Sequence, residues 1–276
     1  LDSLYAKTEG LSFEVLVVDN ASPVRPTLLP DDRRITFLPS PENLGFGRAN
    51  NLGASHARGK YLFCLNPDTL LMNNAVKELF DFMEGHPEAG VCGANLYKAD
   101  QTPGHSYEIR EPGILQELIN SRSCTMARFN EDFNAGTTPK EVPHVVGAAL
   151  MISKALFDRI GGFDKDFFMY LEETYLCYQV RQLGYRIYNV PTSRIIHLEG
   201  QSFTLRTHYE DFLFDARRTY YTKRYGRAYY HLSNLPYALN ALANFLYLRL
   251  RGKKNEAQIW RYRLQKVGQP AKPSAK

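Results

Sequence analysis

Residues 60–68, KYLFCLNPD, decide the fold. This short apolar run of β-forming residues stops at an Asn-Pro-Asp turn, a pattern typical of a buried strand. A run of the same kind, residues 13–19 (FEVLVVD), lies upstream, and residues 45–59 have a helical pattern closed by a glycine. Strands that alternate with helices predict a mainly parallel sheet flanked by helices, and hence the α/β class.

The rest of the chain continues this alternation and then changes. We expect further strands at residues 34–38, 89–94, 145–152, 185–190 and 194–197, and further helices at residues 74–85, 154–160 and 172–183. From Tyr209 onward the pattern is helical, with a break expected near Pro236, which suits the first turn of a helix. These patterns predict one α/β domain over residues 1–205 and a helical C-terminal extension over residues 206–276.

Charge and cysteine content restrict the setting. The 276 residues include 34 Lys and Arg against 29 Asp and Glu, and basic residues concentrate after Arg206. A local basic surface is typical of contact with an anionic partner, such as a nucleotide diphosphate or acidic lipid headgroups, and no nucleic-acid-binding motif is found. Cys64, Cys92, Cys124 and Cys177 have neither metal-finger nor redox-motif spacing, which favours a reducing, cytoplasmic setting.

The turn after the deciding strand is the first candidate for chemistry. Asn66 and Asp68 lie two residues apart, so in an extended segment their oxygen-bearing side chains lie on the same side. A carboxylate at a strand end can hold a hard divalent cation that also binds two phosphates. Asn, Pro, Asp and Thr are also common in plain turns, so a structural role stays open at this point.

Two acidic residues and one histidine are further candidates. Glu172 and Glu173 begin a predicted helix, and a carboxylate within hydrogen-bond reach of a sugar hydroxyl can act as its general base. Acidic residues also occur in first helical turns because they complement the helix dipole. His197 ends a strand before a Gly turn, where it suits metal or diphosphate binding, although a lone histidine is often structural.

Six motifs stand in a characteristic order along the chain: VVDNAS, NLGFGRANN, LNPDT, VVGAALM, GGFDKDFFMYLEE and HLEGQS. In this set the chain resembles the inverting glycosyltransferases of family 2, which have the GT-A fold, a Rossmann-like sheet flanked by helices. Within that family it is most similar to bacterial rhamnosyltransferase-type enzymes of surface polysaccharide synthesis. The resemblance extends from about residue 13 to about residue 226.

The resemblance implies a role for each matching position. Glu173 would be the catalytic base, with Glu172 beside it, and a Mg²⁺ or Mn²⁺ ion would be bound by Asp68 with help from His197. The nucleoside-diphosphate sugar, a dTDP- or UDP-sugar, would be bound by Asp19, Arg48, Asn51, Asn66, Asp68, Gly147 and Ala148. The acceptor would be a glycan or a lipid-linked glycan.

Three departures from the family pattern keep other functions open. Tyr175 stands where many relatives have Asp, the acidic pair is Glu-Glu, and a central first strand is expected to precede Leu1. One alternative is therefore a catalytically degenerate GT-A scaffold or sugar-binding subunit of a synthesis complex. Another is a sugar nucleotidyltransferase, which would release pyrophosphate instead of a nucleoside diphosphate.

The C-terminal helix has its own alternatives. Residues 237–254 combine an apolar face with a basic end, which suits a helix that lies in a membrane interface. The same pattern suits packing on the catalytic domain or on a second copy in a homodimer. The expected location is the cytoplasm or the inner face of the cell membrane.

Overall fold

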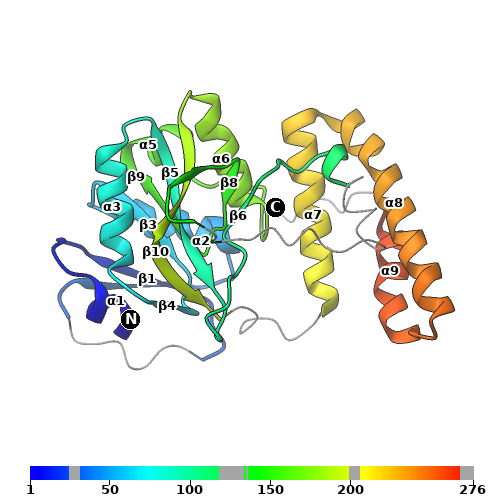
Figure 1. Ribbon diagram of the computed structural model, residues 1–276, viewed down its shortest axis with the longest axis horizontal. Helices are drawn as coiled ribbons and strands as arrows, with labels where there is room; N and C mark the ends of the chain where they lie inside the picture. The colour runs from blue at the N-terminus through cyan, green and yellow to red at the C-terminus, as the bar shows by residue number, and fades with distance from the viewer. Residues whose placement is uncertain (25–31, 118–133, 135, 199–205, 268–276) are drawn as a thin grey trace. The chain divides into compact units, whose positions relative to one another are not determined.

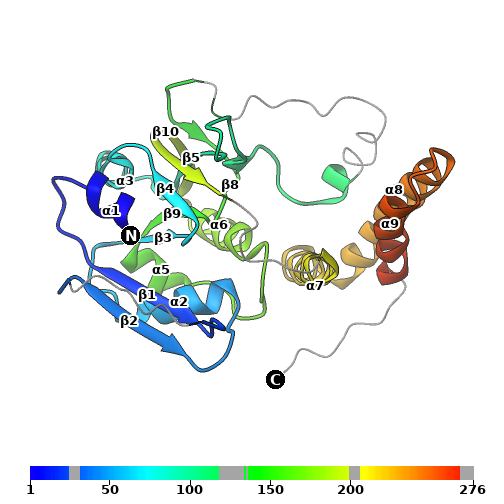
Figure 2. The same cartoon turned by 90° about the horizontal axis from the view of Figure 1, so that it is seen from below.

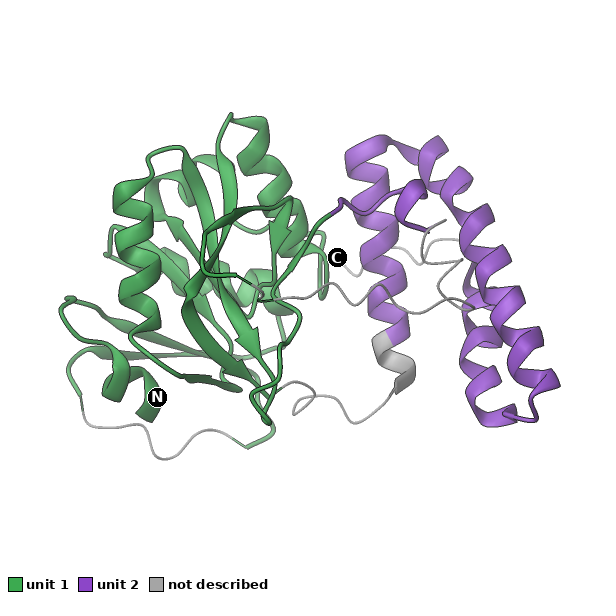
Figure 3. Cartoon of the chain, in the orientation of Figure 1, with its two compact units in different colours: residues 1–109, 132–204 green, residues 110–131, 205–276 purple. Residues whose placement is uncertain are grey.

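The computed structural model describes residues 1–24, 32–117, 134, 136–198 and 206–267. Two compact units are found (Figure 3): unit 1 holds residues 1–109 and 132–204, and unit 2 holds residues 110–131 and 205–276. We expected residues 1–205 to form one continuous domain, but residues 110–117 group with the C-terminal helices instead. Cys124, residues 199–202 of the HLEGQS motif and the expected tail at 270–276 lie outside the described residues.

A six-stranded sheet forms the centre of unit 1 (Figure 1). Its strand order is β3 (Tyr61–Leu65), β9 (Ala149–Ser153), β5 (Ala89–Tyr97), β10 (Arg186–His197) and β4 (Thr69–Leu71), with β7 (Lys140–Glu141) also paired to β10. The α/β class is confirmed, but the expectation of a mainly parallel sheet is wrong for these strands. β9, β4 and β7 run opposite to β3, β5 and β10. An apolar run shows that a strand is buried, but it carries no information about the direction of its neighbours.

The remaining strands of unit 1 form two small sheets. β1 (Val15–Asn20) pairs in parallel with β2 (Ile35–Ser40), and β6 (Tyr107–Glu108) pairs antiparallel with β8 (His144–Val145). Helix α2 (Phe46–His56) packs on β1, where a Cβ at Gly53 would lie 3.2 Å from Val18. α2 therefore approaches β1 closely because position 53 has no side chain.

Helices cover both faces of the central sheet. α3 (Ala75–Gly85) packs on β5 and β10 and buries Leu79, while α5 (Lys154–Ile160) and α6 (Glu172–Gln182) pack on the other side. Along β9 the side chains alternate between the two cores, because Leu150 faces one and Met151 the other. This two-sided burial explains the uninterrupted apolar run at residues 149–152. A short helix, α1 (Asp2–Lys7), lies near β4.

Unit 2 consists of α7 (Arg206–Tyr225), α8 (Arg227–Leu250) and α9 (Lys254–Val267), with residues 114–117 also helical. A buried arginine lies at its centre. Arg217 Nε donates to Glu117 Oε1 at 2.6 Å, Nη2 donates to Ser233 Oγ at 2.8 Å, and the guanidinium lies 4.7–4.8 Å from the rings of Tyr221 and Tyr237. The buried cation is stabilised because it is both paired and held against aromatic faces.

The predicted helix break at Pro236 is wrong. α8 runs through Pro236 without interruption, and the chain turns instead at Gly226, whose φ of +92° lies in the left-handed region that glycine adopts freely. A proline inside a helix removes one backbone hydrogen bond and costs about 3 kcal/mol. Pro236 is buried within α8, and helical periodicity alone does not reveal that the helix continues through it.

Because Gly45 has no side chain, the segment before α6 can lie close to the start of α2. Its φ is +78°, a Cβ at this position would lie 2.1 Å from the carbonyl oxygen of Phe168, and the same oxygen accepts a 3.0 Å bond from the N–H of Phe46. We expect Gly45→Ala to destabilise the protein by about 2–3 kcal/mol, since it adds a clash to a left-handed backbone. Chemical denaturation would measure this loss.

The matched control is Gly85→Ala, because nothing lies within 4 Å of a Cβ at that helical position. There we expect no loss of stability, since alanine is a better helix former than glycine. Equal effects of the two substitutions would contradict the assigned role of Gly45.

Candidate active site

The pairing of β4 with β10 brings Asp68 and His197 together. His197 lies opposite Thr69 in this antiparallel ladder, and the N–H of Leu198 donates to the carbonyl oxygen of Asp68 at 2.9 Å. His197 Nε2 is then 3.4 Å from Asp68 Oδ1, and the side chains are only 13% and 16% exposed. A carboxylate and an imidazole from distant parts of the chain thus converge at one edge of the sheet.

Asn66 belongs to the same edge. Its side-chain nitrogen lies 3.5 Å from His197 Nε2, and its backbone N–H donates to the carbonyl oxygen of Ala148 at 2.9 Å. The turn itself is closed by Thr69 Oγ1, which donates to the Asn66 carbonyl oxygen at 2.6 Å. The turn is therefore held in one conformation, with Asp68 beside the histidine.

The donor set at this edge fits a divalent cation that shares its coordination with a substrate. Asp68 offers a hard oxygen ligand and His197 an imidazole nitrogen, and such cations take their remaining ligands from phosphates and water. Within the described ranges no group of three or more His, Cys, Asp and Glu side chains gathers. Asp68 and His197 are two side chains at this edge that could ligate such a cation.

The acidic pair, Glu172 and Glu173, begins α6 directly after two residues with an unusual backbone conformation. Tyr170 and Leu171 have φ values of +73° and +63°, in the left-handed region that non-glycine residues rarely adopt. Each such residue costs of the order of 1–3 kcal/mol, and strain of this kind clusters at functional sites. This tight turn leads into α6, which begins with Glu172 and Glu173. The loop before the turn also contacts Gly45.

Both carboxyl groups of the pair have raised pKa values. Burial, followed by the charge of Glu173, raises the pKa of Glu172 to about 8, and only 3% of Glu172 is exposed. Burial also raises the pKa of Glu173, although backbone N–H groups at the start of α6 and the charge of His105 lower it in part. Among the described residues, Oε2 of Glu172 finds no hydrogen-bond partner. The pair therefore holds a proton more tightly than ordinary carboxylates do.

Gly147 and Ala148 connect the acidic pair to the Asp68 edge. A Cβ at Gly147 would lie 3.4 Å from Glu173 Cβ and 3.3 Å from the ring of Phe46. The next residue, Ala148, accepts the bond from Asn66. Glu173 and the turn that contains Asn66 and Asp68 thus contact neighbouring residues, Gly147 and Ala148.

The other predicted binding residues lie near the carboxyl end of β1 and along α2. Asp19 is buried and its Oδ1 accepts from the N–H of Ser22 at 3.0 Å, while Arg48 Nε donates to the carbonyl oxygen of Leu44 at 2.7 Å. Asn51 bonds to both backbone groups of Phe163 at 2.8 Å and so attaches the loop after α5 to α2. The hydrogen bonds of Asn51 are structural, and its contact with a nucleotide stays a prediction.

Two residues near the site were not singled out from the sequence. The side chain of Asn20 bonds to Asn43, to the N–H of Leu44 and to the Gly45 carbonyl oxygen, at 2.7–3.2 Å, and so holds the loop before α2. The only signal in the sequence was its place directly after Asp19. The second is His105, whose Nε2 lies 2.9 Å from Glu108 Oε1 and whose charge lowers the pKa of Glu173. His105 and Glu173 are 68 positions apart in sequence, so no local pattern indicates this interaction.

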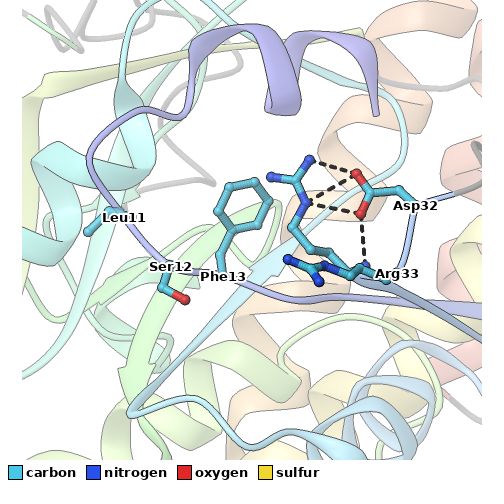
Figure 4. Close-up of a pocket in the computed structure, with 6 residues that line it drawn as sticks. Leu11, Ser12, Phe13, Asp32 and Arg33 are labelled. Carbon is cyan, nitrogen blue, oxygen red and sulfur yellow. Dashed lines mark hydrogen bonds and ion pairs between the residues drawn. The ribbon is translucent and has the colours of Figure 1, made fainter.

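A separate cavity of about 540 Å³ lies at the other end of β1 and β2 (Figure 4). Phe13, Asp32 and Arg33 are among its lining residues, and Arg34 Nη2 pairs with Asp32 Oδ2 at 2.6 Å. Because Asp19 is at the carboxyl end of β1 and Phe13 precedes that strand, this cavity is not part of the candidate active site.

Comparison with known proteins decides the family. The model of the family "Glycosyl transferase family 2" matches residues 1–161, more than half of the chain. The chain belongs to glycosyl transferase family 2. The matched part of this family 2 chain includes Asp19 and Asp68 but ends before the acidic pair.

Curated relatives agree with this assignment. Rhamnosyltransferase WbbL of Escherichia coli is 27% identical over 55% of this chain and 60% of its own length. The low-salt glycan biosynthesis hexosyltransferase Agl10 of Haloferax volcanii is 26% identical over 71% and 62%, respectively. An N-acetylglucosaminyl-diphospho-decaprenol L-rhamnosyltransferase of Mycobacterium tuberculosis is 25% identical over 73% and 71%. The matches thus span about six tenths of the length of the first two relatives.

Solved structures show the GT-A fold. The mannosyltransferase PcManGT from Pyrobaculum calidifontis, in complex with GDP-Man and Mn²⁺, aligns with a TM-score of 0.54 at 17% identity over 96% of this family 2 chain and 78% of its own. GalNAc-T7 with UDP, GalNAc and Mn²⁺ aligns with a TM-score of 0.52 at 15% identity over 76% of this chain and 44% of its own.

The raised pKa of Glu172 predicts that the free energy of unfolding falls as the pH rises. A carboxyl group whose pKa rises from 4.5 to about 8 on folding stabilises the folded state fully below pH 4.5, and this stabilisation is lost as pH rises through about 8. Glutamine has no charge to bury, so we expect Glu172→Gln to be more stable than the native chain by on the order of 2 kcal/mol above about pH 8. Denaturant unfolding at acidic and alkaline pH would measure this difference.

Glu9→Gln serves as the control, because Glu9 is exposed on the surface of unit 1. Its pH dependence of stability should match that of the native chain. If Glu172→Gln also kept the native pH dependence, the burial of an ionisable group at this position would be refuted.

Proposed function

We propose that the chain is an inverting, divalent-cation-dependent glycosyltransferase that moves a sugar from a nucleoside-diphosphate sugar to an acceptor hydroxyl. One observation carries the proposal: Gly147 and Ala148 contact Glu173 on one side and the turn that holds Asp68 on the other. A sugar seated on these two residues has a general base and a diphosphate-binding edge within reach.

The donor occupies the carboxyl ends of the strands. Asp68 and His197 would hold the divalent cation, whose charge would neutralise the diphosphate leaving group. Asp19, at the end of β1, binds the nucleoside, with Arg48 and Asn51 along the same wall. Ligand binding at this edge is general for α/β sheets, because the loops there converge at the strand ends.

Glu173 acts on the acceptor. It takes the proton of the acceptor hydroxyl while that oxygen forms its bond to the anomeric carbon, and the bond from that carbon to the diphosphate oxygen breaks. One displacement from the face opposite the leaving group inverts the anomeric configuration. The raised pKa of Glu173 makes it a stronger base than an exposed carboxylate.

The relatives support a choice of donor and acceptor. A dTDP-rhamnosyl transferase, RfbF of Shigella flexneri, is 22% identical over 72% of this chain, and the Mycobacterium tuberculosis relative is named for a lipid-diphosphate acceptor. We therefore propose a dTDP- or UDP-sugar donor and a glycan or lipid-linked acceptor, which places the reaction in the cytoplasm or at the inner face of the membrane.

The first experiment is nucleoside diphosphate release from a panel of UDP-, dTDP- and GDP-sugars, with Mg²⁺, with Mn²⁺ and with a chelator. Release that needs the cation, and an inverted linkage in the product, are the expected results. Donor binding without turnover would favour a catalytically degenerate scaffold, for which the tilted ring contacts of Tyr175 with Phe167 and Tyr178 are the structural argument. Release of pyrophosphate would indicate a sugar nucleotidyltransferase.

A further inference from the structure

The solvent-facing side of α8 is a continuous row of leucines. Six of them follow one another at intervals of three or four residues, so they lie on one face of the helix. Their exposed fractions run from 43% to 88%: Leu232, Leu235, Leu239, Leu242, Leu246 and Leu250. The buried side chains of α8, which include Ser233, Ala241 and Asn244, lie on the opposite face. We call the six leucines the leucine face.

The leucine face is not used in the packing of unit 2. α8 packs against α7 and α9, and α8 and α9 lie side by side in both views (Figures 1 and 2). The sequence predicts an apolar face within residues 237–254, and the structure leaves the leucines of α8 exposed. The face extends about 27 Å from Leu232 to Leu250, and contiguous exposed apolar surfaces of this kind mark interaction sites on soluble proteins.

Basic residues flank the leucine face. No Lys, Arg, Asp or Glu occurs from residue 228 to residue 248, whereas Arg227 precedes this stretch and Arg249, Arg251, Lys253 and Lys254 follow it. Over residues 206–276 the chain has 15 Lys and Arg against four Asp and Glu. An apolar face bordered by cations is the pattern of a helix that lies in the interface of an anionic bilayer.

Three cations in the last turn of α8 and just after it are not paired with a carboxylate of the described chain. Each described acidic residue of unit 2 pairs with a cation: Glu111 with Arg224, Glu117 with Arg217, Glu210 with Arg263, Asp211 with Lys266, Asp215 with Arg218 and Glu256 with Lys253. In the described part of the chain no carboxylate pairs with Arg249, Arg251 or Lys254, and all three are exposed. Their charges are available to a ligand outside the chain.

We propose that the leucine face is a membrane-docking surface, with its leucines at the level of the acyl chains and the basic turn after Leu250 among anionic lipid headgroups. Charge argues against a second copy as the occupant. α8 has no acidic residue, so a parallel pair would bring two basic C-terminal ends together and an antiparallel pair would set each of them beside Arg227. Neither arrangement supplies the opposite charges that specify such pairs. Among the described residues no helix has the length and mean hydropathy needed to span a bilayer, so α8 lies along the surface.

Vesicle co-sedimentation of the full chain tests the proposal without any assay of activity. The probes are vesicles of phosphatidylcholine alone and of phosphatidylcholine with about one third phosphatidylglycerol. We expect binding to the anionic vesicles, a loss of about tenfold or more in Leu239→Gln/Leu242→Gln, and a smaller loss in Arg251→Glu/Lys254→Glu. Leu115→Gln, at an exposed leucine of unit 2 outside the face, and Lys7→Glu, at an exposed lysine of unit 1, are the matched controls and should bind as the native chain does.

Circular dichroism of each variant would confirm that the helices are retained, since all the substituted side chains are exposed. The proposal is overturned if anionic vesicles do not bind the chain, or if the double leucine substitution leaves binding unchanged. It is also overturned if light scattering finds a dimer that Leu239→Gln/Leu242→Gln converts to a monomer, because the leucine face would then be an interface between two copies.

Discussion

Replacement of Glu173 by Gln is expected to lower kcat by about 10³-fold, because Gln has nearly the same shape but cannot accept the proton of the acceptor hydroxyl. KM for the donor should stay within about threefold of the native value, since Glu173 is proposed to act on the acceptor and not on the diphosphate. The measurement is steady-state release of nucleoside diphosphate, together with calorimetric titration of the donor.

Two further variants sharpen this test. Glu9→Gln makes the same chemical change at an exposed position and should keep full activity. Glu172→Gln replaces a group that burial and the charge of Glu173 keep neutral up to about pH 8, so the pKa of Glu173 and the rising limb of the profile of kcat/KM against pH should stay close to their native positions. Undiminished activity in Glu173→Gln would show that another group is the base.

Replacement of Asp68 by Ala is expected to lower kcat/KM by about 10²–10³-fold, because the diphosphate leaving group loses the charge compensation that a bound cation supplies. His197→Ala should have the same direction of effect and a smaller size, since an imidazole contributes less than a carboxylate to binding a hard cation. Activity over a range of Mn²⁺ concentrations, and calorimetric titration of Mn²⁺ in the presence of the nucleoside diphosphate, would measure both effects.

The control for Asp68 is Asp81→Ala, an exposed aspartate on α3 that pairs with Lys77. It should leave both the rate and the metal titration unchanged. If Asp68→Ala instead bound Mn²⁺ and nucleoside diphosphate as tightly as the native chain, the assignment of the metal to the Asp68–His197 edge would be abandoned, even if activity fell.

Local sequence patterns were sufficient to predict where the candidate residues at strand ends lie in the fold. Asp19 and Asp68 each stop an apolar run, and the glutamates begin a helix, so their positions follow from the periodicity of burial along the chain. The α/β class followed from the same alternation. These features were predictable because the pattern of apolar residues responds to burial, which is a local property of each residue.

The contacts of the site were not predictable from local patterns. In the sequence, Asn51 is one polar residue on a predicted helix. Only the structure shows that its side chain donates a hydrogen bond to Phe163, 112 positions away. The adjacent Glu173 contributes to the raised pKa of Glu172, but burial is the larger cause for both glutamates, and residues 172–173 themselves do not indicate which distant segments bury them.

By itself the sequence determined which segments are buried and where polar residues interrupt them, because side-chain hydrophobicity and backbone preference act over a few residues. The tertiary structure alone decided that β9 enters the sheet antiparallel, that β10 brings His197 to Asp68, and that the leucines of α8 remain exposed. These outcomes depend on which distant segments pair and pack together, and pairing is selected by the total packing and hydrogen bonding of the folded chain.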